Sequence, residues 1–353
     1  MISKNDANSM KGVAIFFIVF HNLLHITSRL GENEFTFYPG VTNKFLGSLF
    51  SFADNLGSYI FSFLGWYGVA TFLFLSGFGL VKKYEQQESG KKHTFISFMG
   101  QHFIKLFTLL LLPYLAFIAI NYITGHPVPY LTIGKHLLFI ANFWPLQINP
   151  GVYWFFGLIL QFYLCYYIFF YKKPTRNIII LNVISLGILL TLLLLPPTQG
   201  MPIMNWVRHQ FIGWILPFTL GILYARYPIT LVSKKTWVNL LVFTIGVVAL
   251  IASETVAYVW LFNNVISLLL ALTLNELLKK ISLVNQAFVY LGKISAFLFV
   301  IHPVVRYVYF GLKLNNYVYE VVAYGIVSLI LAIVYKWIYD KLFSTIRIDK
   351  LIK

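Results

Sequence analysis

Long apolar stretches recur along this chain of 353 residues, and they limit its fold more than any other feature. A helix needs about 20 predominantly apolar residues to cross the hydrocarbon core of a bilayer. Closely spaced stretches can be divided differently, so nine or eleven spans also fit the sequence. We predict an all-α polytopic integral membrane protein with about ten transmembrane helices. The stretches lie at about 11–29, 56–81, 101–124, 151–171, 176–196, 208–225, 236–254, 256–278, 284–306 and 318–341.

Composition and charge agree with this class. Charged residues make up 11% of the chain and hydrophobic residues 59%, whereas a soluble domain carries about 25% charged residues. The single cysteine, Cys165, excludes an intramolecular disulfide framework and leaves no thiolate metal cluster. With ten spans, about three quarters of the Lys and Arg residues fall on the side that holds both termini, which the positive-inside rule makes cytoplasmic. The positive charges are spread over short loops, so we expect no nucleic-acid partner.

A lysine and two histidines interrupt the first apolar stretch, SMKGVAIFFIVFHNLLH at residues 9–25. Lys11 opens it, His21 lies roughly 15 Å further along a helix, and His25 follows one turn later on nearly the same face. Ionisable residues near the bilayer centre are costly and are therefore functional candidates. Neutral imidazole suits general-base catalysis. Helix packing remains an alternative, whereas a metal site lacks an evident carboxylate or third histidine.

Four further segments carry polar residues or short motifs inside apolar sequence. Each alone has an ordinary explanation: glycine for close packing, tryptophan as an interface anchor, and His-Pro as a kink. Their order along the chain is harder to explain by packing alone. The segments are GWYGVATFLFLSGFGLVKK with Ser76-Gly77-Phe78, FMGQHFIKLFTLLLLPY with His102 and Lys105, PGVYWFFGLILQFYLCYY with Trp154-Phe155 and Gln161, and YLGKISAFLFVIHPVVRY with Gly292-Lys293-Ile294-Ser295 and Ile301-His302-Pro303.

Taken in order, these segments resemble the membrane-bound acyltransferase 3 family over about residues 8–340. Members open with a basic residue and a histidine on an apolar helix, then carry an FFxLSGF-like span, a basic segment, a WFL-type span and a late LGxxSxxxYLxHxP segment. Here Lys11 replaces the usual arginine and lies ten positions before His21 instead of eleven, about 80° out of register on the helix. His102 and Lys105 also stand where the family usually has arginines.

The resemblance implies O-acyl transfer, most often of acetyl from cytoplasmic acetyl-CoA, to a cell-envelope polysaccharide or a lipid-linked sugar. Such a reaction needs a base, donors for the oxyanion and a site for the anionic CoA. We interpret His21 as the base and His25 as its reserve, and His302 as a third catalytic candidate. The residues that we expect to hold the CoA phosphates are Lys11, Lys82, Lys83, Lys91, Lys92, His102 and Lys105.

An acceptor site is expected toward the outer side, where aromatic faces and hydrogen-bonding side chains can meet a sugar ring. We place Tyr153, Trp154, Gln161 and Arg306 there; Arg208, His209 and Glu254 are weaker candidates. Packing explains Tyr153, Trp154 and Gln161 about as well. Topology signalling explains the loop lysines about as well.

The sequence thus predicts a single transmembrane acyltransferase domain over residues 1–353, an enzyme that transfers groups other than aminoacyl groups. We expect a multi-pass protein of the bacterial plasma membrane, with acetyl-CoA or another acyl-CoA as donor and no metal. Its partners would be membrane lipids and a glycan, and it could form a homo-oligomer. The competing class is a glycan exporter, flippase or proton-coupled transporter that uses His21 and His25 as a proton relay. A scaffold in a polysaccharide-synthesis complex is a third possibility.

Overall fold

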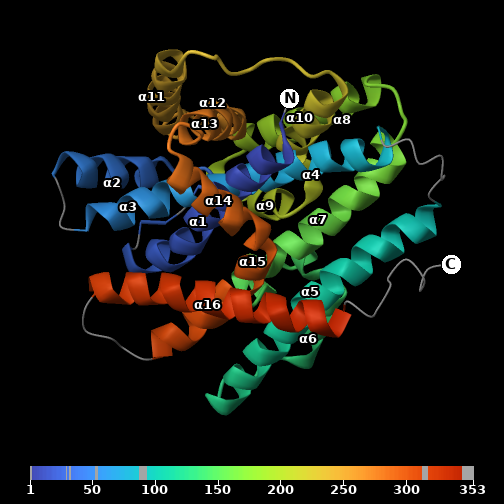
Figure 1. Cartoon of the computed structure of the whole chain (residues 1–353), viewed down its shortest axis with the longest axis vertical. Helices are drawn as coiled ribbons and strands as arrows, with labels where there is room; N and C mark the ends of the chain where they lie inside the picture. Colours follow the sequence, from blue (N-terminus) through green and yellow to red (C-terminus); the bar gives the residue numbers. More distant parts are fainter. Residues whose placement is uncertain are drawn as a thin grey trace. The chain divides into compact units, whose positions relative to one another are not determined.

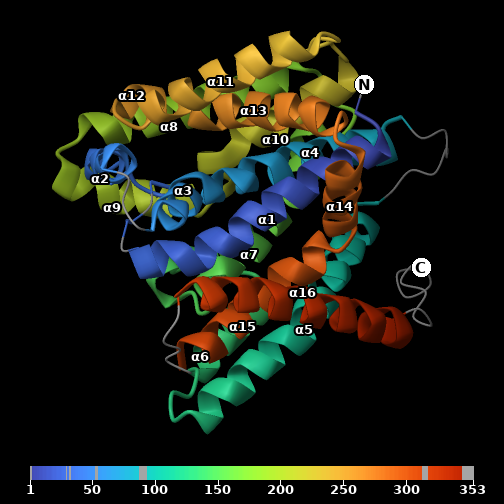
Figure 2. The same ribbon diagram turned by 60° about the vertical axis from the view of Figure 1, so that its left-hand side comes forward.

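The computed structural model of the chain describes residues 2–28, 30–31, 33–51, 55–86, 94–311 and 317–343. These residues form helices and connecting segments, with no strand among them. The chain divides into two compact units (Figures 1 and 2). Unit 1 comprises residues 1–87 and 168–293, and unit 2 comprises residues 88–167 and 294–353.

Unit 1 holds the N-terminal helices and the middle of the chain. In Figure 1 its helices run from the blue α1 to the orange α13 and α14, and α11 lies beside α13 in both ribbon views. Its helices are α1 (Lys4–Ser28), α2 (Pro39–Phe50), α3 (Leu56–Leu64), η1 (Gly65–Tyr67), α4 (Gly68–Tyr84), α8 (Arg176–Leu194), α9 (Pro197–Arg208), η6 (Phe211–Trp214), α10 (Ile215–Arg226), α11 (Thr236–Ser253), α12 (Ala257–Trp260), α13 (Asn263–Leu278) and α14 (Ser282–Lys293).

Unit 2 is built around α5, which contacts both α7 and α15, while α15 also packs on α16. Tyr114, Phe117 and Tyr153 belong to its buried core. The π-helical turn η5 (Tyr166–Phe170) carries the chain from this unit back into unit 1. Its helices are α5 (Phe95–Ile123), α6 (Tyr130–Leu137), η2 (Ala141–Phe143), η3 (Pro145–Gln147), η4 (Gly151–Tyr153), α7 (Trp154–Cys165), α15 (Ser295–Gly311) and α16 (Tyr317–Phe343).

The all-helical, membrane-spanning class predicted from the sequence is confirmed. Among the described residues, seven helices are long and apolar enough to span a membrane, or eight if α14 and α15 form one broken span. The predicted stretches 208–225 and 256–278 correspond to the shorter apolar helices Phe211–Arg226 and Asn263–Leu278. The predicted stretch 284–306 is interrupted between α14 and α15. The count of ten spans and the cytoplasmic position of both termini stay predictions.

Close packing of α4 on α10 depends on one glycine from each helix. A Cβ atom on Gly77 would lie 2.2 Å from the carbonyl oxygen of Phe218, and one on Gly221 would lie 2.0 Å from that of Phe74. Small residues at such a crossing let two helix backbones approach closely, which is a main source of helix association in membranes. The glycine of the Ser76-Gly77-Phe78 motif therefore has a packing role.

The contact between α1 and α14 is built in the same way. A Cβ atom on Gly12 would meet the carbonyl oxygen of Phe288 at 1.9 Å, and one on Gly292 would meet that of Asn8 at 1.8 Å. Gly292 belongs to the late sequence motif, so this motif glycine also marks a helix crossing. The crossing fixes α1, the helix that carries His21, against the rest of unit 1.

Candidate functional site

His21 is buried inside unit 1, and one of its ring nitrogens is fixed by the backbone. The side chain is 3% exposed, and its Nδ1 lies 2.9 Å from the carbonyl oxygen of Ser62 in α3. A carbonyl oxygen only accepts hydrogen bonds, so Nδ1 must carry the proton for this bond to form. In that tautomer the lone pair of neutral His21 is on Nε2, and Nε2 is the nitrogen that can accept a proton.

The 3-10 turn η1, which follows α3, also packs closely on His21. A Cβ atom on Gly65, the first residue of η1, would lie 2.1 Å from the Cβ of His21. Only glycine lets α3 and η1 pack so closely on α1. A short 3-10 turn within a longer apolar span often marks a functional position, and here it marks the position of the buried histidine.

His25 lies one turn after His21, and the structure brings the two rings together. Their centroids are 4.9 Å apart and their planes differ by 15°. Nδ1 of His25 lies 2.9 Å from the main-chain oxygen of His21, within the same helix. His25 is only partly buried, in contrast to His21. The helix geometry expected from the four-residue spacing is confirmed; a catalytic role for either ring stays a prediction.

The basic residues predicted to hold the donor divide between the two units. Lys11 is partly buried on α1, and Lys82 and Lys83 lie in the last turn of α4, all in unit 1. Nζ of Lys82 donates to Oε1 of Gln86 at 2.6 Å. The ammonium of Lys83 lies 4.8 Å from the ring centroid of Tyr84. Lys91 and Lys92 lie outside the described residues.

Arg226 is a cation of unit 1 that the sequence analysis did not single out. Its Nε and Nη2 donate to the two carboxylate oxygens of Glu85 at 2.9 and 2.8 Å. Nη2 also donates to the carbonyl oxygen of Phe170 at 2.5 Å. This two-bonded ion pair joins the end of α10 to the residue after α4, next to Lys82 and Lys83. A charge pair of this geometry fixes position more firmly than a single contact.

His302 is the most deeply buried histidine candidate, and it lies in α15 of unit 2. Its exposed fraction is 0%. Nδ1 lies 3.0 Å from the carbonyl oxygen of Leu298 in the same helix, so Nδ1 carries the proton. Nε2 is buried and has no hydrogen-bond partner. A native structure seldom leaves a buried polar atom unpaired, and such an atom calls for an explanation in function or in an absent ligand.

Tyr153 is joined to the helix of His302. Its hydroxyl donates to the carbonyl oxygen of Val300 at 2.7 Å, and its side chain is 2% exposed. Trp154 is also buried, while Gln161 and Arg306 are partly buried, all in unit 2. A buried hydroxyl already bonded to the backbone is typical of packing. For Tyr153 the geometry therefore favours the packing alternative, and its role as a sugar contact stays a prediction.

His102 and Lys105 lie three residues apart on α5 in unit 2. Nδ1 of His102 lies 2.8 Å from the carbonyl oxygen of Phe98, and its ring centroid is 4.0 Å from that of Tyr163. Lys105 is exposed. Lys105 is the eleventh residue of α5, about 15 Å along that helix from its first residue.

A carboxylate surrounded by donors, the Glu254 cluster, lies elsewhere in unit 1. Oε1 of Glu254 accepts hydrogen bonds from the Tyr67 hydroxyl at 2.5 Å and from Asn263 Nδ2 at 2.7 Å. Oε2 accepts from Asn33 Nδ2 at 2.6 Å. The Thr42 hydroxyl donates to the main-chain oxygen of Glu254 at 3.2 Å. Burial raises the pKa of Glu254, which follows the end of α11, and the three side-chain donors oppose that rise.

Arg208 lies beside this cluster and is enclosed by aromatic rings. Its Nε and Nη2 donate to the carbonyl oxygen of Glu34 at 2.9 and 2.6 Å. The guanidinium carbon lies 4.5 Å from the ring of Trp214 and 4.9 Å from that of Trp260. Burial lowers the pKa of Arg208 to about 10, and the charges of Glu34 and Glu254 oppose that fall.

The Glu254 cluster is the polar site that sequence analysis largely missed. Glu254 and Arg208 were weaker candidates, whereas Asn33, Tyr67 and Asn263 were not singled out. The available signal was an asparagine pair, Asn263-Asn264, inside an otherwise apolar stretch. Within the part of the chain that the structure describes, no group of three or more His, Cys, Asp or Glu side chains could hold a metal ion.

These features define a class: a multi-pass helical membrane protein with histidines buried inside its spans. A family model described as an acyltransferase domain matches residues 5–337. The chain therefore belongs to the acyltransferase 3 family, as its ordered motifs predicted. Searches of the curated proteins and of the solved structures gave no match.

Proposed function

We propose that this membrane acyltransferase moves an acyl group, in the simplest case acetyl, from a cytoplasmic CoA thioester to a hydroxyl of a cell-envelope polysaccharide or lipid-linked sugar. His21 is the general base. The protein would work in the bacterial plasma membrane. The observation that carries this proposal is the buried His21 ring, whose Nδ1 bonds to the Ser62 carbonyl so that Nε2 carries the lone pair.

The proposed reaction has two proton transfers, one as the tetrahedral intermediate forms and one as it collapses. Nε2 of His21 takes the proton of the acceptor hydroxyl while that oxygen attacks the thioester carbonyl carbon. The intermediate collapses, the carbon–sulfur bond breaks, and the leaving CoA thiolate takes the proton from the imidazolium. The Ser62 carbonyl stabilises the imidazolium because its bond to Nδ1–H becomes charge-assisted. Neutral His21 is regenerated, and the products are an ester and CoA.

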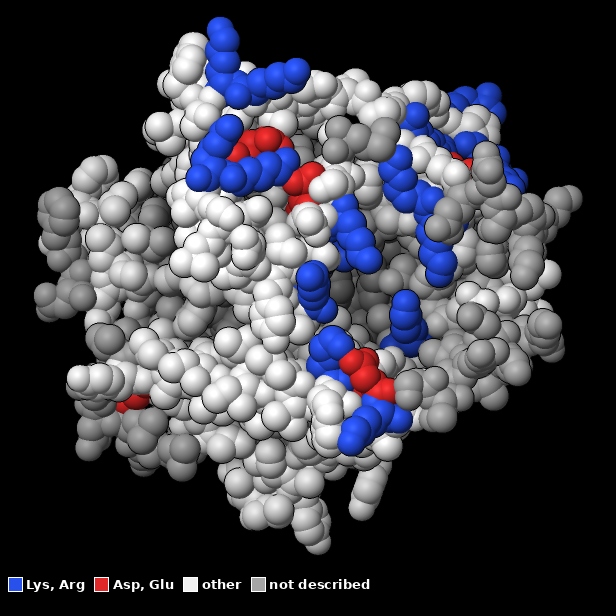
Figure 3. Space-filling view, in the orientation of Figure 1, with Lys and Arg blue, Asp and Glu red and all other residues white. Residues whose placement is uncertain are grey.

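The CoA phosphates would be bound by basic side chains. Figure 3 shows separate Lys and Arg side chains among a largely uncharged surface. Exposed Lys83 and Lys105 and partly buried Lys11 are the contacts that we favour. Lys82 and His102 are the remaining donor contacts of the proposal. Lysine binds a phosphate as a point charge, without the paired geometry that arginine offers, so we expect a modest affinity for CoA.

His302 is assigned to the acceptor side of the reaction. Its unpaired, buried Nε2 can accept a hydrogen bond from a sugar hydroxyl. Trp154, Gln161 and Arg306 complete the proposed acceptor contacts. His25 lies in ring contact with His21, and we assign it a positioning role, with base catalysis as its reserve role.

The decisive experiment uses the full chain in nanodiscs with radiolabelled acetyl-CoA. Slow thioester hydrolysis replaces transfer while the acceptor is unidentified. We expect His21→Ala to reduce turnover by about 10²–10⁴-fold, the usual contribution of a general base. His25→Ala, on the same helix, removes only the proposed positioning contact and should reduce turnover far less than His21→Ala does. Thermal unfolding of both variants checks that they are folded.

Two results would contradict the proposal. If His21→Ala hydrolyses acetyl-CoA at the parent rate, His21 is not the base. If the parent protein neither binds nor hydrolyses acetyl-CoA or longer acyl-CoA thioesters, the acyl-CoA donor is wrong. The transport alternative would then be favoured, with His21 and His25 as a proton relay.

A further inference from the structure

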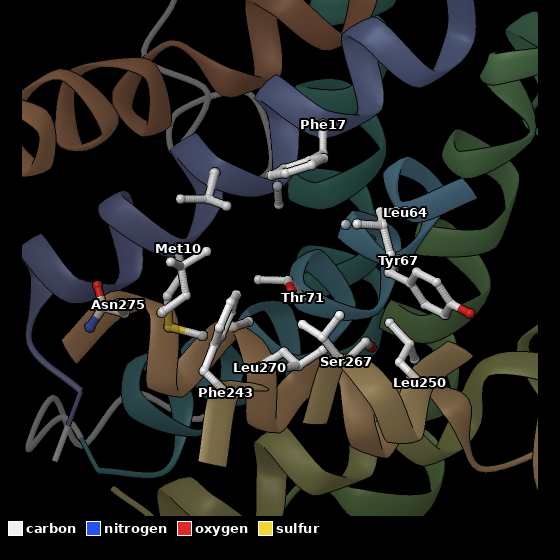
Figure 4. A pocket seen from close by; sticks show the side chains of 16 residues that line it. Met10, Phe17, Leu64, Tyr67, Thr71, Phe243, Leu250, Ser267, Leu270 and Asn275 are labelled. Atoms are coloured by element: carbon white, nitrogen blue, oxygen red, sulfur yellow. The ribbon is translucent and has the colours of Figure 1, made fainter. Parts of the chain in front are cut away.

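An apolar pocket lies among α1, α3, η1, α4, α11 and α13 of unit 1, apart from the residues assigned to catalysis (Figure 4). Its volume is about 120 Å³. In Figure 4, Met10 and Asn275 lie at one end, and Leu64, Tyr67 and Leu250 lie at the other. The Tyr67 hydroxyl points away from the pocket and donates to Glu254. The pocket is therefore separate from the Glu254 cluster.

The walls of the pocket are regular helical stripes. Met10, Val13, Ala14 and Phe17 line it from α1, and these positions share one face of a helix. Seven residues of helix extend about 10 Å, so the pocket runs alongside α1 for about that distance. A long, narrow and apolar shape of this kind fits an extended hydrocarbon chain better than a sugar or a nucleotide.

One end of the pocket has polar character, and it contains an unpaired acceptor. Nδ2 of Asn275 donates to Oδ1 of Asp6 at 3.2 Å, which fixes the orientation of the amide. Oδ1 of Asn275 is then buried and has no hydrogen-bond partner, although the side chain lines the pocket. An unpaired buried carbonyl oxygen calls for a donor. A ligand that carries an N–H or O–H group at this end would supply that donor.

Charges of both signs surround this end. Nζ of Lys279 lies 2.8 Å from Oδ1 of Asp6 and 2.5 Å from Oε1 of Glu276. Lys280 follows and is exposed. Two carboxylates and two ammonium groups balance each other, so the site complements a headgroup that carries both a phosphate and an ammonium. An anionic headgroup would meet two carboxylates, and a headgroup without N–H or O–H groups could not donate to Asn275.

We propose that the pocket binds a phospholipid of the phosphoethanolamine class. A short part of one acyl chain lies between α1, α11 and α13, and the headgroup ammonium donates to Oδ1 of Asn275. A chain in the pocket loses little by leaving the bilayer, because lipid tails are as apolar as the pocket wall. Selectivity comes from the polar end. Filling the space also restores the dispersion contacts that an empty cavity lacks.

The test is independent of the proposed acyl transfer. The full chain is purified in detergent, and bound lipid is measured by native mass spectrometry and by lipid extraction. We expect one phosphoethanolamine lipid bound to the parent. Val247→Phe, which fills the pocket, should reduce bound lipid at least fivefold. Val248→Phe makes the same change on the next residue of α11, which is 63% exposed and outside the pocket, and should retain the lipid.

The headgroup is tested by reconstitution in nanodiscs of phosphatidylethanolamine or of phosphatidylcholine, whose choline has no N–H. The parent should have a higher thermal stability in phosphatidylethanolamine, and Asn275→Leu should remove that difference. Equal lipid loss from Val247→Phe and Val248→Phe, or equal stability of the parent in both lipids, would overturn the proposal. A third result would also overturn it: Val247→Phe keeps its lipid but loses turnover of octanoyl-CoA relative to acetyl-CoA. The pocket would then bind the acyl chain of the donor instead of a lipid.

Discussion

Two deeply buried polar groups, one in each unit, differ in whether their polar atoms have hydrogen-bond partners. Glu254 of unit 1 is 1% exposed, and each of its carboxylate oxygens accepts at least one short hydrogen bond. His302 of unit 2 is 0% exposed, and its Nε2 has no partner. Burying an unpaired polar atom costs free energy, whereas a satisfied network stabilises the fold. The contrast favours a structural role for Glu254, and it is the reason for proposing a functional role for His302.

His21 is a third buried polar group, and the proposal makes it the general base. Its Nδ1 is committed to the Ser62 carbonyl, as a structural side chain would be. Its other nitrogen keeps the lone pair that base catalysis needs. A ring whose tautomer is fixed by the backbone suits the general base that we propose. For His21 the proposal therefore rests on the tautomer that the backbone selects, and not on burial alone.

The largest expected effect on stability comes from removing the carboxylate of the Glu254 cluster. Glu254→Ala leaves the Tyr67 hydroxyl and two asparagine amides without their acceptor. Unpaired buried groups cost about 1–3 kcal/mol each, so we expect a loss of about 3–5 kcal/mol in the free energy of unfolding. Thermal unfolding of the purified protein measures it. Glu254→Gln, which keeps one acceptor oxygen, should lose less; equal stability of Glu254→Ala and the parent would refute the structural role.

A smaller effect, on activity, is expected at the contact between η1 and His21. Gly65→Ala adds a methyl group where a Cβ atom would lie 2.1 Å from the His21 Cβ, so α1 or η1 must shift. A displacement of about 1 Å at a reacting group can reduce a rate by as much as 10²-fold. We expect turnover of acetyl-CoA to fall about 10- to 100-fold while the KM for the donor stays near that of the parent.

The matched control for this substitution is Gly79→Ala in α4. A Cβ atom on Gly79 would meet nothing within 4 Å, so that variant should keep both activity and stability. Gly65→Ala with normal turnover would show that the position of His21 is not set by η1. Loss of turnover in both variants would point to a general effect on the span.

The sequence predicted the helical class and the family, because both depend on apolar length and on motif order along the chain. It gave close packing as the ordinary explanation of the motif glycines, and Gly77 and Gly292 do lie at two helix crossings. It did not predict the partners of Glu254, since Asn33, Tyr67 and Asn263 come from separate segments and meet only through tertiary packing. The interruption between α14 and α15 was missed because the Gly292-Lys293-Ile294-Ser295 segment was taken as a motif inside one apolar stretch, although it is where the two helices part.

His136 of unit 2 gives a pH-dependent contrast with the histidines inside the spans. It lies in α6, is 3% exposed, and its Nε2 accepts from the main-chain N–H of Asn149 at 3.3 Å. Burial lowers the pKa of His136 below 6.5. The unfolded chain then binds a proton more readily than the folded chain does, so stability is lost as the pH falls below 6.5. We expect hydrogen exchange of residues 130–150 to increase between pH 7 and pH 5, and much less so in His136→Gln.

The smallest expected effect on stability is at His302, where the contrast with Glu254 is sharpest. His302→Leu removes a buried nitrogen that has no partner and keeps an apolar side chain in the same space. The carbonyl oxygen of Leu298 lies one helical turn before residue 302 and can still accept its intrahelical bond. We expect the free energy of unfolding to change by less than about 1 kcal/mol, while acyl transfer to a glycan falls at least tenfold. A large loss of stability would mean that His302 is a packing residue; unchanged stability with full activity would remove it from the acceptor site.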